Sequence, residues 1–417
     1  MLLGERNGAL NVLVRTIVPL WEIGPIDLFS MTGMILVQGF GLVGILYLFA
    51  SASLRTFDTS LEEASAASGA STISTLRRIT LPLLKPHLLG ALILAIILSL
   101  ESFEVPLLLA LGAGRDILST RIYFAMSDAT GGAPNYGQVA ALGLHFLALT
   151  YSLFYLYYRI TRSRTPFAII RGQQPSRSRV SLGRWKWFAA AATWIFLLVS
   201  TCAPVVILIW TSLLPYYLYP SIDGLASISF EQYTDLFGDA RFASAAINTV
   251  IVAVIAPSIS VTVGLMVAWA VDRRLVPTAV RGVLDLGTSS SIAIPGVVAA
   301  NAFLLFFLRL DVGLPSWIPL LGTISVLIFA YSYRLSLAYR IQLAGIVQVS
   351  PELMDAAHVS GADGVNTLRR VVVPLIRPST VGAWAFLAVV AVRELTLPLI
   401  LSSGAPPHTI STLIWQL

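Results

Sequence analysis

One sequence is written twice in this chain, as LEEASAASGASTISTLRRITLPLLKP at residues 61–86 and as LMDAAHVSGADGVNTLRRVVVPLIRP at residues 353–378. The two copies lie 292 residues apart, align without a gap and are identical in 12 of 26 columns. The same offset continues downstream, where Pro106-Leu107 matches Pro398-Leu399. A segment that recurs at a fixed offset indicates two copies of one structural module in a single chain.

The composition indicates that the chain is a polytopic membrane protein. Apolar residues make up 56% of the chain, charged residues 12%, and the mean hydropathy is +0.81. These values predict an all-α polytopic bundle of about eight spanning helices, because a helix needs about 20 apolar residues to cross the hydrocarbon core. The expected spans are residues 31–51, 87–112, 139–158, 188–214, 244–271, 283–308, 320–337 and 380–401.

The basic residues indicate the topology. Most Lys and Arg residues fall in segments 53–87, 159–187, 272–282 and 338–379, which helix parity places on the same side as the first repeated segment. By the positive-inside rule this side is the cytoplasm, so both repeated segments are cytoplasmic. The net charge of +6 is therefore a topology signal and does not indicate nucleic-acid binding. Cys202 is the only cysteine, which excludes an internal disulfide and a thiolate metal site.

The repeat also divides the chain. We expect a first module at residues 1–160, a basic cytoplasmic linker at 161–187 and a second module at 188–417. In the register of the repeat, residue 1 corresponds to about residue 293 and the second copy ends before an equivalent of the 139–158 span. Both modules are thus expected to be incomplete, and the chain to be part of a protein with about twelve spans.

Each repeated segment predicts a short helix, a glycine turn and a second helix. Thr59 or Ser60 can cap the first helix of copy one, and Pro351 with Glu352 begins that of copy two. Gly69 and Gly361 permit the positive φ that ends a helix. Small residues after Glu63 make a face of low relief that another protein can approach closely.

The first copy fits the pattern EAA, three residues, Gly, nine residues and I-x-L-P, in the residues Glu63-Ala64-Ser65, Gly69 and Ile79 to Pro82. In this it resembles the membrane permeases of binding-protein-dependent ABC importers, whose cytoplasmic EAA loop has that signature. Copy one departs from the pattern by a serine in place of the second alanine. Copy two, with Asp355-Ala356-Ala357, Gly361 and Val371 to Pro374, departs by Asp for Glu and Val for Ile and Leu.

The resemblance implies that each loop carries a coupling helix that docks in a groove of an ATP-binding subunit. It implies two copies of that ATPase, an extracytoplasmic substrate-binding protein, membrane lipid around the spans, and a location in the bacterial inner membrane. The chain shows no G-x-x-x-x-G-K-[ST] segment, so ATP would be used by the partner, and the chain would be a transport subunit with no catalytic residue, metal or cofactor of its own. The coupling residues that the resemblance implies are Glu63, Ala64, Ser65, Gly69, Leu81, Pro82, Asp355, Ala356, Ala357, Gly361, Val373 and Pro374.

Four charged residues in two corresponding spans are candidates for a pathway or gate: Glu101, Glu104, Arg393 and Glu394. Glu101 and Arg393 are equivalent positions of the repeat, and a lone charge in a bilayer is costly, so we expect them to face each other as an ion pair. The alternative interpretation is that these residues lie near the headgroups and are solvated.

The fused layout and the run ESFEVP at 101–106 are closest to the ferric-iron type of ABC permease. Related permeases carry polyamines, phosphonates, sulfate or thiamine. Two other classes remain open: a gradient-driven secondary transporter, which also uses internal repeats, and a membrane-anchored structural protein. Dependence of transport on ATP distinguishes the first class from both.

Overall fold

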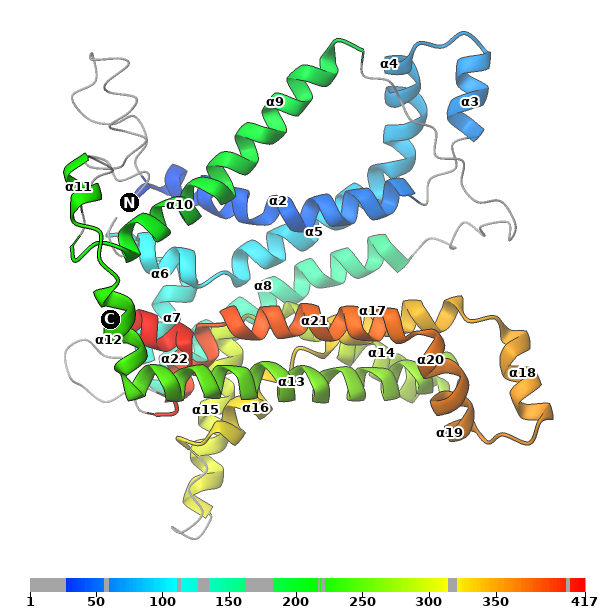
Figure 1. The fold of residues 1–417 in the computed structure, drawn as a ribbon. Helices are drawn as coiled ribbons and strands as arrows, with labels where there is room; N and C mark the ends of the chain where they lie inside the picture. Colours follow the sequence, from blue (N-terminus) through cyan, green and yellow to red (C-terminus); the bar gives the residue numbers. More distant parts are fainter. Residues whose placement is uncertain are drawn as a thin grey trace. The chain divides into compact units, whose positions relative to one another are not determined.

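The computed structural model describes residues 28–55, 60–110, 114–126, 135–162, 183–216, 218, 222–313, 321–402 and 406–416. Within these ranges the regular structure is helical, without strands (Figure 1). The chain is therefore the all-α membrane protein that its composition predicts. Its contacts divide it into two compact units, residues 1–117 with 152–238, and residues 118–151 with 239–417.

The first unit is built around α2 and α5, which pack on each other. Its elements are α2 (Met31–Arg55), α3 (Ser60–Ala67), α4 (Thr72–Thr75), η1 (Leu76–Thr80), α5 (Leu81–Glu101), α6 (Glu104–Ala110), α9 (Trp185–Leu197), η2 (Leu198–Cys202), α10 (Ala203–Ser212), α11 (Ile222–Ala226) and α12 (Glu231–Gly238). Helix α8 (Tyr136–Arg162) contributes its second part to this unit and its first part to the other.

The second unit is built around α13, α17 and α21, which run side by side (Figure 1). Its elements are α7 (Leu118–Met126), α13 (Ala240–Asp272), α14 (Thr278–Ser290), η3 (Ser291–Ala293), α15 (Gly296–Gly313), α16 (Ile324–Tyr331), α17 (Leu335–Gln348), α18 (Pro351–Val359), α19 (Gly364–Thr367), η4 (Leu368–Val372), α20 (Val373–Leu375), α21 (Arg377–Arg393), α22 (Thr396–Ser402) and α23 (Ile410–Gln416).

The duplication extends from sequence to structure. At the same offset of 292 residues, α4 and α19, η1 and η4, and α6 and α22 have matching first and last residues. The continuous helix α2 corresponds to the pair α16 and α17, and α5 corresponds to α20 and α21. The predicted module boundaries stay a prediction, since the two contact units divide the chain differently and most of the expected linker, residues 163–182, lies outside the described residues.

Among the described helices, three are long and apolar enough to cross a membrane: Tyr136–Ile160, Trp185–Ser212 and Ala240–Asp272. The number rises to six if each of three bent helix pairs counts as one span. One of these pairs, Thr278–Ala293 with Gly296–Leu310, bends by 110°. The expected span at 320–337 is divided into α16 and α17, because the chain leaves the helix at Ser332–Arg334, where the carbonyl of Ser332 accepts a hydrogen bond from Ser260 Oγ (3.1 Å).

Helices α13 and α17 approach closely at Gly264. A Cβ at this position would lie 3.0 Å from the backbone nitrogen of Tyr339 and 3.1 Å from Cβ of Ala338. Nearby, Gln342 Nε2 on α17 donates to the carbonyl of Val261 on α13 (2.6 Å). The absence of a side chain at Gly264 thus sets the distance between the two central helices of the unit.

Replacing Gly264 with alanine is expected to destabilise the protein by about 1–3 kcal/mol, because the added methyl group forces the two backbones apart. The measurement is thermal unfolding in detergent. The matched control is Gly382→Ala on α21, where a Cβ meets nothing within 4 Å and alanine should be neutral or stabilising in a helix. Equal melting temperatures for the two variants would contradict the close packing.

Candidate functional site

The first repeated loop ends its exposed helix with a Schellman motif. The amide of Ala70 donates to the carbonyl of Ser65 (3.1 Å) and the amide of Gly69 to that of Ala66 (2.9 Å). Gly69 takes a φ of +79°, a conformation that L residues other than glycine adopt at a cost. The chain then leaves α3 and turns into α4.

The second loop repeats this geometry bond for bond. The amide of Ala362 donates to the carbonyl of Ala357 (3.0 Å) and the amide of Gly361 to that of His358 (2.9 Å). Gly361 has a φ of +81°. The predicted glycine turns are therefore present in both copies.

After the turn, each loop continues into a capped short helix and then a π-helical turn. The side chains of Ser71 and Asp363 accept hydrogen bonds from the backbone amides of Ser74 and Asn366, which begin α4 and α19. The π turns η1 and η4 follow directly and lead into α5 and α20. Each loop is thus connected through its π turn to a long apolar helix, and in copy two this connection bends by 75° between Leu375 and Arg377.

The predicted coupling residues lie mainly on the surface of these loops. Helix α3 has no buried residue, and in α18 only Met354 is buried. The exposed ones are Glu63, Ala64, Gly69, Leu81, Pro82, Asp355, Ala356, Gly361 and Pro374; Ser65, Ala357 and Val373 are half-buried. Large apolar side chains stand beside them, with Leu61 46% and Val359 89% exposed. Each loop thus offers a small carboxylate-bearing helix with apolar neighbours.

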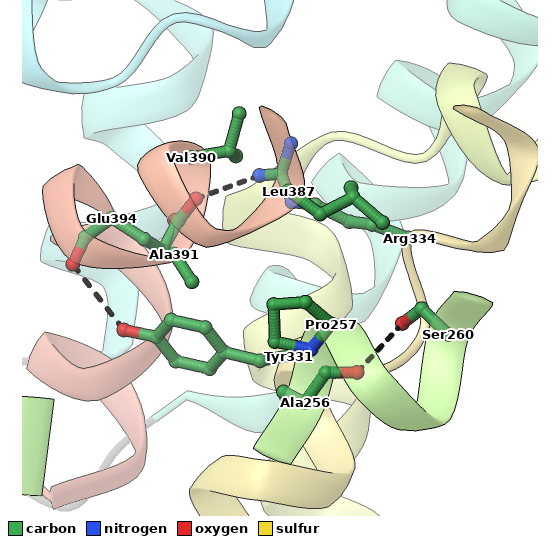
Figure 2. A pocket seen from close by; sticks show the side chains of 9 residues that line it. All are labelled: Ala256, Pro257, Ser260, Tyr331, Arg334, Leu387, Val390, Ala391 and Glu394. Carbon is green, nitrogen blue, oxygen red and sulfur yellow. Dashed lines mark hydrogen bonds and ion pairs between the residues drawn. The ribbon is translucent and has the colours of Figure 1, made fainter. Parts of the chain in front are cut away.

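A second polar cluster lies where α21 ends. Arg334 Nη2 donates to Glu394 Oε2 across 2.8 Å, and the Glu394 side chain is only 8% exposed. The carbonyl of Glu394 accepts from Tyr331 Oη (3.3 Å) and from Ser411 Oγ (2.7 Å). Figure 2 shows the guanidinium and the phenol reaching Glu394 from two directions beside a small cavity.

This cavity has a volume of about 10 Å³ and is lined by α13, α16, α21 and the chain at Arg334. Such a volume holds about one water molecule.

Glu394 is one of the candidate pathway residues, whereas Arg334 is not among them. The available signal was a single arginine inside the apolar run at 320–337, since a charge in a span usually has a partner.

Comparison with known proteins relates the chain to a family of transport proteins. Residues 10–166 match the family described as "Binding-protein-dependent transport system inner membrane component". This part of the chain is therefore similar to the permeases of that family, which are multi-pass subunits of the inner membrane.

Curated relatives of the chain carry names from the same class. It is 26% identical over 359 residues to the putative ferric transport system permease protein FbpB 1 of Haemophilus influenzae, covering 85% of this chain and 54% of the relative. It is 25% identical over 360 residues to the ferric transport system permease protein FbpB of Actinobacillus pleuropneumoniae, covering 85% of this chain and 50% of the relative. The chain thus spans about half the length of these relatives.

A shorter match has a different named cargo. Over 113 residues, 27% of this chain and 36% of the relative, the permease is 34% identical to the sulfoquinovosyl glycerol transport system permease protein SmoG of Agrobacterium fabrum. Among solved structures, a bacterial ABC transporter involved in the import of alginate is 20% identical, with a TM-score of 0.41 over 56% of this chain and 84% of that one.

In the two repeated loops, different contacts hold the first helix against the π turn. In copy one, Thr80 Oγ1 donates to Glu62 Oε1 across 2.6 Å, which ties α3 to the end of η1. The equivalent residues of copy two are Met354 and Val372, which are both buried in an apolar cluster with Trp269 and Tyr339. A hydrogen bond in one loop is thus replaced by apolar packing in the other.

A second difference concerns the departure of copy one from the EAA pattern. The Ser65 and Thr75 hydroxyls are hydrogen-bonded across 2.8 Å. In copy two the equivalent of Ser65 is Ala357, and the fully buried Thr367 Oγ1 has no hydrogen-bond partner among the described residues. The serine is therefore a structural partner for the threonine of its own loop.

Replacing Ala357 with serine is expected to stabilise the second loop by about 1 kcal/mol, because it supplies a partner to the buried Thr367 hydroxyl. The measurement is protection of the loop from limited proteolysis, together with thermal unfolding. The matched control is Ala357→Ser in a protein that also carries Thr367→Val, in which the gain should disappear. A gain that persists without the threonine hydroxyl would show that the hydrogen bond is not its cause.

The remaining candidate pathway residues, Glu101, Glu104 and Arg393, lie at helix ends. Glu101 and Glu104 are half-buried on either side of the break between α5 and α6, and Arg393 is exposed at the end of α21. Glu101 and Arg393 belong to different units, so their pairing stays a prediction.

Proposed function

We propose that this permease is the membrane subunit of an ATP-driven importer of ferric iron, and that it is coupled to two ATP-binding subunits through its two repeated loops. The observation that carries the proposal is that both loops have the same helix, the same glycine turn, the same capped second helix and the same π turn. Two matched surfaces fit two copies of one partner. ATP is bound and hydrolysed by that partner.

The loops have a geometry suited to transmission of force. The exposed α3 and α18 present the carboxylates of Glu63 and Asp355, which can pair with a basic or polar group of an ATPase groove. Closure of the ATPase subunits displaces these helices, and the π turns pass the displacement to α5 and α20. The two modules then rock to alternate access, after an external binding protein has delivered the cargo to the outer face.

Ferric iron as the cargo is supported by the two FbpB relatives, whose printed names describe ferric transport. Polyamines, phosphonates, sulfate and thiamine are the other cargoes of related permeases. Uptake of radioactive iron by cells that carry the complete transporter, with each of these compounds in tenfold excess as competitor, identifies the cargo. Inhibition by a compound other than ferric iron would assign the permease to that compound.

The experiment that tests the proposed function is purification of the permease in detergent, followed by identification of co-purifying proteins and by reconstitution. We expect an ATP-binding subunit to co-purify, and uptake into proteoliposomes to need ATP and to be insensitive to a protonophore. Glu63→Lys together with Asp355→Lys should weaken this association. Uptake that follows an ion gradient and ignores ATP would instead establish a secondary transporter.

A further inference from the structure

Three helix breaks in the second unit are hydrogen-bonded to one another. The break between α16 and α17 is tied to the 110° bend between α14 and α15, since Tyr333 Oη donates to the carbonyl of Ile294 (3.4 Å) and the amide of Ser336 to Ser291 Oγ (2.9 Å). The third break lies between α21 and α22. Arg334, at the α16–α17 break, is tied to it through the ion pair with Glu394. Non-helical backbone at three adjacent places marks a part of the membrane domain that can change its conformation.

The ion pair is absent from the other copy of the module. Its equivalents at the repeat offset are Leu42 and Ser102, and the helix α2 runs unbroken through Leu42. The module therefore forms its helices without this pair. Because a buried ion pair is seldom needed for stability, its presence in one copy points to a role other than folding.

The pair is also connected to the second loop. Arg334 directly precedes α17 and Glu394 directly follows α21. At the opposite ends of these two helices, Met354 of α18 packs in one buried cluster with Ile346 of α17 and Ile376, the residue before α21. A displacement of α18 thus acts on both helices that hold the ion pair.

We propose that Arg334 and Glu394 form a releasable latch that holds the α16–α17 break against the end of α21 at rest, and that movement of the second loop opens it in each transport cycle. The proposal rests on the proposed coupling function. In the closed state the guanidinium neutralises the buried carboxylate and closes the small cavity beside Ala256 and Ser260. When α17 and α21 move relative to each other, the two charges separate and the cavity opens to water.

The test uses a cysteine probe in the cavity. Ala256 lines the cavity and is 1% exposed, so Ala256→Cys should react with a water-soluble methanethiosulfonate only when the latch is open. Cys202 is exposed and is first replaced by serine. The matched control is Ala268→Cys, which is on the same helix, fully buried, and in the apolar cluster away from the cavity. The full-length permease is used in complex with its ATPase subunits, and ATP hydrolysis is measured in the same samples.

We expect the probe at position 256 to react about tenfold faster during ATP hydrolysis than at rest, while the probe at 268 stays unreactive. In the resting protein Glu394→Gln should raise the rate at 256 by a similar factor without ATP, since it removes the charge-assisted bond and keeps the shape of the side chain. The swapped pair Arg334→Glu with Glu394→Arg should lower the rate again. A variant of the surface pair, Arg241→Gln, which is partnered with Asp239, should leave the rate unchanged.

Two results would overturn the latch. One is ATP hydrolysis with no change in the reactivity of position 256, which would leave the coupling function intact. The other is an unchanged resting rate in Glu394→Gln, which needs no ATPase and therefore decides the question even if no ATPase subunit binds.

Discussion

Replacing both Gly69 and Gly361 with valine is expected to abolish co-purification of the ATPase subunits and ATP-dependent uptake. Both glycines have a φ near +80°, and a β-branched residue there costs about 1–2 kcal/mol or more. A Cβ at either position meets nothing within 4 Å, so the effect comes from the backbone alone. The valine residues should unwind the ends of α3 and α18 and turn their carboxylates away from the partner, with about a tenfold loss of affinity in each loop.

The controls separate backbone strain from side-chain size. Asparagine adopts the left-handed conformation more readily than valine, so Gly69→Asn with Gly361→Asn should retain most of the association. Gly41→Val makes the same chemical change in α2, where a Cβ also meets nothing within 4 Å. This variant should keep its association with the ATPase subunits. If the asparagine and valine variants lose the ATPase equally, the glycine turns are not what presents the coupling helices.

Replacing Arg334 with methionine is expected to destabilise the protein by about 3–5 kcal/mol, because it leaves the buried Glu394 carboxylate without its ion-pair partner. Replacing both Arg334 and Glu394 with methionine should return the stability to within about 1 kcal/mol of the original, since apolar residues of similar volume can substitute for a buried pair. Thermal unfolding in detergent measures both variants.

The pair of variants forms one double-mutant cycle, completed by Glu394→Met alone. Glu394→Met alone should lower the stability less than Arg334→Met alone. The unpaired Arg334 side chain is 28% exposed and its guanidinium can reach water, whereas the Glu394 side chain is only 8% exposed. Additive effects of the two single substitutions would show that the charges do not interact in the folded protein. Restored stability with lost uptake in the double variant would separate the transport role of the pair from folding.

The structure of the two repeated loops could be predicted because it is local. The fixed offset, the glycine before each second helix and the capping residues all lie within 26 consecutive residues. What could not be predicted depends on distant partners. Arg334 and Glu394 are 60 residues apart, and the bond between Glu62 and Thr80 depends on how the loop folds back on η1. The burial of Thr367 without a hydrogen-bond partner among the described residues is likewise visible only in the folded loop.

The spans were predicted less completely because hydropathy measures length and composition, and the structure adds bends. The run at 320–337 is apolar enough for a span, yet the helix is interrupted where the carbonyl of Ser332 and the side chain of Arg334 find partners on α13 and after α21. Similarly, the expected span at 283–308 contains a bend of 110° at Ile294-Pro295. In both cases tertiary hydrogen bonds stabilise a helix break that a sliding-window average of hydropathy does not detect.

The single occurrence of the ion pair, at Arg334 and Glu394 but not at Leu42 and Ser102, has a consequence for a chain that carries two copies of a repeat. If two identical subunits formed this transporter, every residue would occur on both sides of the translocation pathway, and a joint in one half would require the same joint in the other. Here α2 runs unbroken through Leu42, while its counterpart is interrupted at Ser332–Arg334. Fusion frees each half to acquire substitutions independently, so one half can provide a fixed frame and the other the moving part.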